Sequence, residues 1–166
     1  MTSNQILQYS ARFFLLLIWQ VLVLKNMPLG QVNIYIYPIA LLLLPLEISH
    51  GLLIVIGFAS GLIIDMFYDT AGLHAGVMAL VGLLRPITCM LYEPRGGYEM
   101  GQALTRERLG WNWFFKYTAT LFAVTIFAIT ILEDLDFSLV WLMRFVISYI
   151  VSMIFVMLYQ FIFNPK

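Results

Sequence analysis

The sequence predicts an all-α polytopic membrane protein, with about six transmembrane helices packed into one compact bundle. Its 166 residues are 62% hydrophobic and only 11% charged, whereas soluble domains are about half apolar and about a quarter charged. The apolar residues also fall into separate runs, most of which are long enough to cross a hydrocarbon core of about 30 Å. Because no soluble linker or internal repeat separates these runs, we expect residues 1–166 to form a single transmembrane helical domain.

The apolar runs define six candidate helices. No small-x-small cleavage pattern follows the first run, so we interpret it as a retained helix rather than a signal peptide. The second contains Pro38 and Pro45 and reaches only about 21 Å at about 1.5 Å per residue, so we expect a short or interrupted helix. The turn-like YDTAG between the third and fourth runs predicts an antiparallel hairpin. The six runs are residues 6–25, 33–46, 51–68, 72–92, 111–132 and 138–163.

The charged loops predict the orientation of the bundle. The long loop before the fifth run is rich in arginine, whereas the loop EDLDF between the last two runs is acidic and holds no Lys or Arg. Since cytoplasmic loops carry an excess of Lys and Arg, we expect the long loop in the cytoplasm and, with six spans, both termini there as well. Basic side chains on this side, and Arg12, are expected to extend to lipid headgroups. The predicted cytoplasmic basic face consists of Arg85, Arg95, Arg106, Arg108 and Lys116.

Small residues follow a helical stripe in the third and fourth runs. Gly57, Gly61 and Asp65 are spaced four residues apart, and Gly72 and Gly76 repeat this spacing at the start of the next run. Residues with this spacing share one helix face, and glycines there allow a second helix to approach closely. The stripe therefore predicts a helix-packing or partner-binding surface. The approaching helix belongs either to this chain or to another protein.

Asp65 is an ionisable group within an apolar run, which is costly near the bilayer centre. In the six-span arrangement it lies about 5 Å below the outer end of its helix. Arg144 lies at a similar height in the last run, whereas Arg85 lies on the cytoplasmic side. We therefore hypothesise an intramembrane ion pair between Asp65 and Arg144. The alternative is that Asp65 caps the following turn or extends to water.

The sequence argues against an enzyme. It contains no HExxH zinc motif, GxSxG nucleophile motif or phosphate-binding glycine loop. Ser60 lies in FASG, which is similar to the serine motif of rhomboid intramembrane proteases, but His50 and His74 are expected at opposite ends of the helix pair, far from Ser60. The same separation argues against a metal site shared by the histidines, and the single cysteine, Cys89, cannot build one. We therefore expect no catalytic residue, metal or cofactor, and we expect no nucleic-acid partner.

The stretch from the second run to the fourth resembles one membrane-protein family. YPIALLLLPLE is followed by a short loop and then by GFASGLIIDMFYDTAGLHA. This order resembles the rod shape-determining protein MreD, whose third helix carries a pattern like G-x-x-x-G-L-x-x-D with a glycine a few residues later. The residues that match are Gly57, Gly61, Leu62, Asp65 and Gly72.

The resemblance implies a non-enzymatic component of the bacterial cell-elongation machinery in the cytoplasmic (inner) membrane. MreD-like proteins act with the single-span protein MreC, near MreB filaments and the peptidoglycan glycosyltransferase and transpeptidase. Such a chain would support peptidoglycan synthesis and cell shape through contacts of its helix faces and short loops. The basic loop 93–110 is then the expected cytoplasmic contact, with a partner or with anionic lipid.

A second function class stays open. The substrate-binding membrane subunits of energy-coupling-factor vitamin transporters are also small six-helix proteins, and the resemblance to MreD implies a fold similar to theirs. Proline-interrupted membrane segments often mark transporter sites, and residues 33–46 have this character. The outer loops, however, show no obvious polar cluster that would hold a vitamin.

Overall fold

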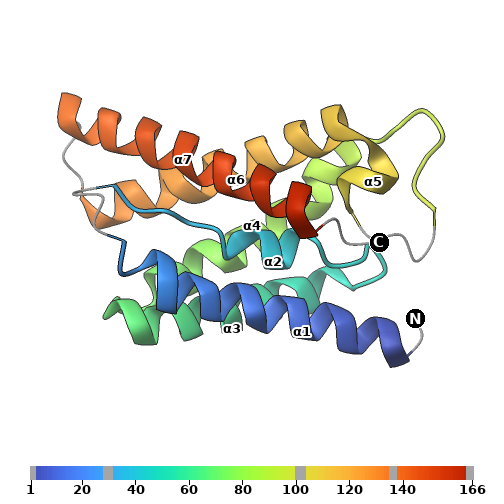
Figure 1. Cartoon of the computed structure of the whole chain (residues 1–166), viewed down its shortest axis with the longest axis horizontal. Coiled ribbons are helices and arrows are strands. Elements are labelled where there is room, and N and C mark those ends of the chain that lie inside the picture. The colour runs from blue at the N-terminus through green and yellow to red at the C-terminus, as the bar shows by residue number, and fades with distance from the viewer. Residues whose placement is uncertain (1–2, 28–31, 100–103, 135–137, 164–166) are drawn as a thin grey trace.

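The computed structural model describes residues 3–27, 32–99, 104–134 and 138–163, and every regular element in these ranges is helical (Figure 1). A short π-helical stretch, η1, continues the first helix directly. The elements are α1 (Ser3–Trp19), η1 (Gln20–Leu24), α2 (Pro38–Leu42), α3 (His50–Tyr68), α4 (Leu73–Leu91), α5 (Arg106–Leu109), α6 (Trp111–Glu133) and α7 (Leu139–Phe163).

Five helical stretches are long and apolar enough to cross a membrane, and they support a multi-pass membrane protein. They are Leu7–Leu24, which combines most of α1 with η1, and the whole of α3, α4, α6 and α7. Large apolar side chains cover the outside of the bundle; Met66 is 80% exposed and Leu139 is 73% exposed. A surface of this kind is stable against lipid and not against water.

The second of the six predicted runs is not a spanning helix, because only five of its residues are helical. Residues 32–36 are irregular, α2 follows, and the chain then turns towards α3. Pro38 is the first residue of α2, a position that its fixed φ favours, and Pro45 follows soon after the helix ends. The prediction of a short or interrupted helix is confirmed, whereas the prediction of six spanning helices is not.

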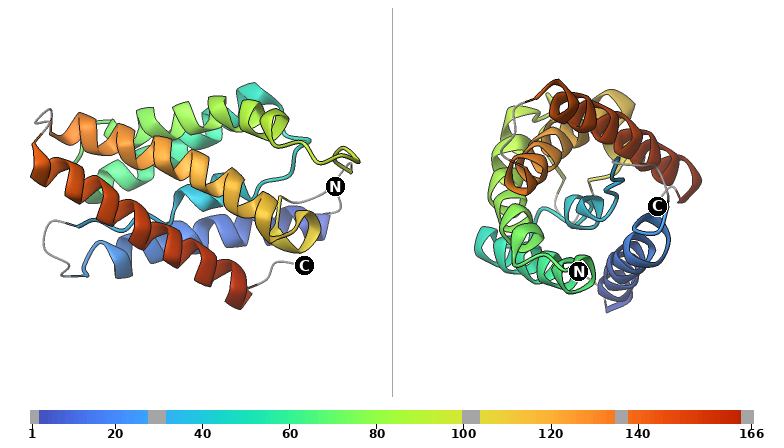
Figure 2. Two further views of the ribbon diagram at one scale, coloured as in Figure 1. Left: turned by 90° about the horizontal axis from the view of Figure 1, so that it is seen from above. Right: turned by 90° about the vertical axis from the view of Figure 1, so that its left-hand side faces the viewer.

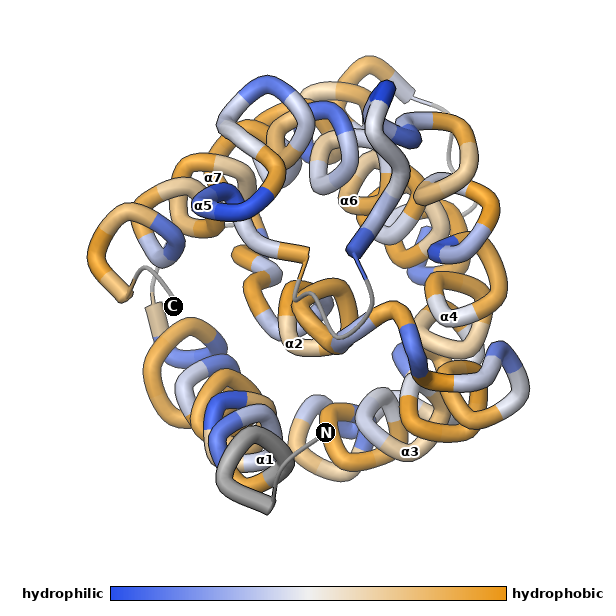
Figure 3. The backbone as a smooth tube through the Cα atoms, turned by 90° about the vertical axis from the view of Figure 1, so that its right-hand side faces the viewer, coloured by the Kyte–Doolittle hydropathy of each residue, from blue (hydrophilic) through white to orange (hydrophobic). Residues whose placement is uncertain are grey.

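This short element occupies the middle of the bundle. We call residues 33–44 the interior segment; from Ile34 to Leu44 no residue is more than 8% exposed. Seen along the bundle, α2 lies inside the ring formed by the long helices (Figure 2, right; Figure 3). The segment enters from the end at which α3 connects to α4 and leaves towards the end at which α3 begins (Figure 1).

The long helices pack mainly in chain order. The predicted hairpin is confirmed: α3 and α4 are antiparallel and form the most extensive pair, α4 packs on α6, and α6 packs on α7. The first helix is more peripheral, and its main tertiary contact is with α2. The start of α1, the start of α3, α5 and the end of α7 lie towards one end of the bundle, which we call the basic end because it carries the arginine-rich loop (Figure 1).

Candidate functional site

The backbone of the interior segment is bonded by one amide side chain over its first half. Gln20 is fully buried, and its Oε1 accepts hydrogen bonds from the backbone N–H groups of Ile36 at 2.8 Å and Tyr37 at 3.4 Å. Its Nε2 donates to the carbonyl of Ile34 and to the hydroxyl of Tyr68, both at 2.8 Å. One residue therefore replaces several of the bonds that a regular helix would have made within itself.

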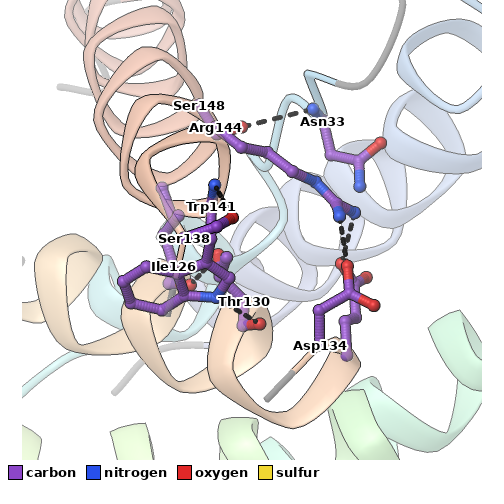
Figure 4. Close-up of polar contacts among 9 residues, drawn as sticks. Asn33, Ile126, Thr130, Asp134, Ser138, Trp141, Arg144 and Ser148 are labelled. Atoms are coloured by element: carbon purple, nitrogen blue, oxygen red, sulfur yellow. Dashed lines mark hydrogen bonds and ion pairs between the residues drawn. The ribbon is translucent and has the colours of Figure 1, made fainter. Parts of the chain in front are cut away.

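Two serines of α7 bond further backbone N–H groups in the first half of the interior segment. Ser152 Oγ accepts a bond from the N–H of Tyr35 at 2.9 Å, and Ser148 Oγ accepts one from the N–H of Asn33 at 3.3 Å (Figure 4). The serines are spaced four residues apart, so they share the helix face that points at the segment. These serines and Gln20 were not among the site residues predicted from the sequence. A signal was present, because each is polar within an apolar run and such residues commonly bond across helices.

Arg85 and Tyr117 bond the other half of the interior segment. Arg85 Nη2 donates to the carbonyl of Leu44, and its Nε donates to the hydroxyl of Tyr117 at 3.1 Å. That hydroxyl donates in turn to the carbonyl of Leu42 at 3.1 Å. These carbonyls lie at the C-terminal end of α2, where no further helical turn could satisfy them.

The placement of Arg85 on the cytoplasmic basic face is therefore wrong. Arg85 is 1% exposed, because its guanidinium bonds the Leu44 carbonyl and the Tyr117 hydroxyl inside the bundle. The other predicted members, Arg95, Arg108 and Lys116, are exposed. Arg106 is half-buried, with its guanidinium 4.5 Å from the Trp111 ring and 5.7 Å from the Phe161 ring.

Asp65 caps the start of α4. Its Oδ1 accepts a bond from the N–H of His74 at 3.0 Å, and its Oδ2 accepts one from the N–H of Ala75 at 2.9 Å. The hydroxyl of Thr70 also donates to Oδ1. These two amides belong to the first turn of α4, where they have no partner within the helix and where a negative charge is favoured. Of the two interpretations of Asp65, the cap is correct.

The hypothesised ion pair between Asp65 and Arg144 is not formed. Arg144 instead contacts Glu133 at 2.8 Å and Asp134 at 2.6 Å, at the junction between α6 and α7 (Figure 4). The hypothesis matched two residues by height in the membrane, but height does not determine the direction in which a helix face points. Arg144 instead bonds acidic side chains about ten residues away in the chain, and Asp65 bonds backbone amides.

The glycine stripe divides into internal and external positions. A Cβ on Gly61 would lie 2.3 Å from the carbonyl oxygen of His74, and one on Gly57 would lie 2.4 Å from that of Met78, so both glycines allow α4 to approach α3. Gly72 precedes α4 with a φ of 84°, which favours glycine. Gly76 is exposed, and a Cβ there would meet nothing within 4 Å. The approaching helix belongs to this chain at Gly57 and Gly61, while Gly76 faces outward.

Replacing Asp65 with Asn is expected to destabilise the α3–α4 hairpin by about 2 kcal/mol, because an amide offers one acceptor atom where two buried N–H groups need one each. The measurement is the denaturant midpoint of the detergent-solubilised protein. Asp69→Asn is the matched control, since Asp69 is exposed and has a φ of 56°, a conformation that Asn also tolerates. Equal midpoints for the two variants would contradict the cap.

A cluster of aromatic side chains surrounds His74 beside this cap. Its ring lies 5.3–6.0 Å from those of Tyr35, Tyr37 and Tyr68, and a hydrogen bond of 2.9 Å joins its Nδ1 to the Tyr37 hydroxyl. In the described part of the chain, His74 Nε2 is buried without a hydrogen-bond partner. Ser60, 1% exposed, donates to the carbonyl of Gly57 at 2.7 Å, which is a packing role. Within the described ranges no three His, Cys, Asp or Glu side chains are grouped so that they could hold a metal ion.

No protein-family model, curated protein or solved structure matches this chain. The geometry itself defines the class: a helical membrane bundle whose centre is filled by an irregular segment of its own chain. The buried polar side chains that bond this segment hold backbone in place. The outer helix faces carry large exposed apolar side chains.

Proposed function

We propose that this chain is a non-enzymatic component of the bacterial cell-elongation machinery that resembles MreD. The observation that carries the proposal is the stretch around Gly57, Gly61 and Asp65, whose pattern resembles the third helix of that family. In this chain the same residues build the α3–α4 hairpin and cap α4. If the two proteins share one bundle architecture, residues that hold two of its helices together are expected to be similar in both.

A filled interior supports a binding function over a catalytic one. The interior segment is almost fully buried, and its backbone engages Gln20, Arg85 and Tyr117. Partner recognition would then use the apolar outer faces and the basic end. On α4 the exposed Gly76 offers a point at which a partner helix, such as the single span of an MreC-like protein, could approach closely.

Two experiments test this function. Depletion of the protein from its rod-shaped host is expected to round the cells, as seen by phase-contrast microscopy, and normal rods after complete depletion would contradict the proposal.

In the second experiment, Gly76→Leu is expected to fold normally but to reduce co-purification of the MreC-like partner at least about tenfold. Gly51→Leu is the control, because Gly51 is exposed and equally open but lies at the start of α3. If equal amounts of the partner were recovered with both variants, Gly76 would not lie in the contact with the partner.

The alternative function is that of a substrate-binding membrane subunit of an energy-coupling-factor vitamin transporter. The broken interior segment favours it, because discontinuous membrane segments often form transporter sites. If the chain has this function, a small molecule is expected to co-purify with the protein, and uptake of a labelled tracer is expected to depend on the protein. Uptake together with unchanged cell shape after depletion would support the transporter and reject the shape function.

A further inference from the structure

The basic end contains a groove between the first helix and the start of the third, and the proposed function assigns no ligand to it. It has a volume of about 290 Å³, close to the lower range of small-ligand pockets. Aromatic rings of α1 form one wall, and aliphatic side chains form the other. The apolar lining residues are Phe13, Phe14, Leu44, Pro45, Ile48 and Ile56.

A small cavity adjoins this groove, since Tyr9, Phe13 and Leu44 line both. The cavity has a volume of about 10 Å³ and is also lined by Arg12 and Thr105. A space of this size holds about one water molecule or one ligand oxygen atom. The apolar groove thus adjoins a small cavity whose lining includes one guanidinium and one threonine hydroxyl among apolar side chains.

The polar groups of the cavity are suited to an anionic ligand. The Thr105 hydroxyl is buried, with the residue 1% exposed, and has no hydrogen-bond partner among the residues that the structure describes. Arg12 is half-buried, and within the described part of the chain the ion pairs found are those of Arg144. A guanidinium and a hydroxyl that line one cavity can both donate hydrogen bonds to a phosphate oxygen. A buried hydroxyl without a partner is costly, so a ligand that satisfies it would be favoured.

We propose that this groove binds one anionic phospholipid, with an acyl chain along the apolar walls and the phosphate at Arg12 and Thr105. The groove is bordered by α1 and α3, two helices with exposed apolar faces of the kind that lipid covers. Arg12 lies a few residues inside the apolar stretch Leu7–Leu24, within reach of a headgroup for a long basic side chain. The arginine-rich loop at the same end attracts anionic lipid to this surface.

Native mass spectrometry of the whole protein in detergent tests the site, with dioleoylphosphatidylglycerol and dioleoylphosphatidylcholine as competing probes. The unaltered protein is expected to retain one phosphatidylglycerol in preference to phosphatidylcholine. Arg12→Gln is expected to reduce this preference about tenfold, and Ile56→Trp is expected to fill the groove and reduce binding of both lipids. Lys116→Gln is the matched control, because Lys116 is an exposed cation near the same end, and it is expected to keep the preference.

Three results would overturn the proposal. They are equal retention of the two lipids by the unaltered protein, an unchanged preference in Arg12→Gln, and an equal loss of preference in Lys116→Gln. Glycerol phosphate, which has the headgroup charge and no acyl chain, is expected not to displace the bound lipid; displacement would assign the site to a soluble phosphate instead. Helical circular dichroism of each variant shows whether the bundle has folded. If Arg12→Gln fails this check, Arg12→Lys takes its place and is expected to retain the preference; loss of the preference in that folded variant would also contradict the proposal.

Discussion

Replacing Gly61 with Ala is expected to destabilise the bundle by about 3 kcal/mol, which is at the upper end of the usual cost of overpacking. The added Cβ would lie 2.3 Å from the His74 carbonyl oxygen and 2.4 Å from Ala75 Cα. Both are backbone atoms of α4, so no side chain can move aside to accommodate the methyl group. The helices would have to separate, and Asp65 would then lose its contacts with the first turn of α4.

The measurement is the denaturant midpoint of the purified protein in detergent, compared with Gly76→Ala. Gly76 lies inside α4 with open space around it, so the same substitution there is expected to be neutral or to stabilise by up to about 1 kcal/mol through helix propensity. A midpoint for Gly61→Ala equal to that of Gly76→Ala would show that α3 and α4 do not approach as closely as described.

Replacing Arg85 with Met is expected to destabilise the protein by about 2 kcal/mol and to loosen the interior segment. Met retains most of the apolar volume but leaves the Leu44 carbonyl without its donor inside the bundle. Lys116→Met, which removes an exposed cation, is expected to change stability by less than about 0.5 kcal/mol. If Arg85→Met were as stable as the unaltered protein, the cost of burying the charge would equal the gain from its hydrogen bonds.

A double-mutant cycle with Tyr117 separates this contact from general packing. Tyr117→Phe alone is expected to cost about 1 kcal/mol, because it removes the hydroxyl that accepts from Arg85 and donates to Leu42. Since the two side chains share one network, the double variant is expected to be about 1 kcal/mol more stable than the sum of the single effects predicts. Strict additivity in the same denaturation assay would contradict the network.

Much of the architecture could be predicted from composition and spacing. Apolar runs of helical length follow directly from the requirement that a chain in lipid satisfies its own backbone, and five of the six predicted runs are long helices. The α3–α4 hairpin followed from the short turn between two such runs. The glycine spacing correctly indicated a close helix approach, and Gly57 and Gly61 make it within this chain.

The partners of the charged side chains could not be predicted in the same way. Depth in the membrane placed Asp65 and Arg144 at one level, yet Asp65 bonds amides of the adjoining helix and Arg144 bonds acids at a junction. Arg85 was expected to extend to lipid, yet it turns inward because unsatisfied carbonyls at the end of α2 lie within its reach. Hydropathy reports how deep a residue lies and says nothing about which neighbour it faces.

The sequence by itself therefore determined that this is a helical membrane protein, five of its six predicted spanning helices, and the interruption at residues 33–46. Each of these depends on local composition and on the length of an apolar run. Only the tertiary structure decided that this interruption lies in the centre of the bundle, where Gln20, Ser152 and Arg85 from three surrounding helices bond its backbone. The physical reason is that a backbone without its own helical hydrogen bonds must find partners across the bundle. Those partners are distant in sequence and are brought together only by packing.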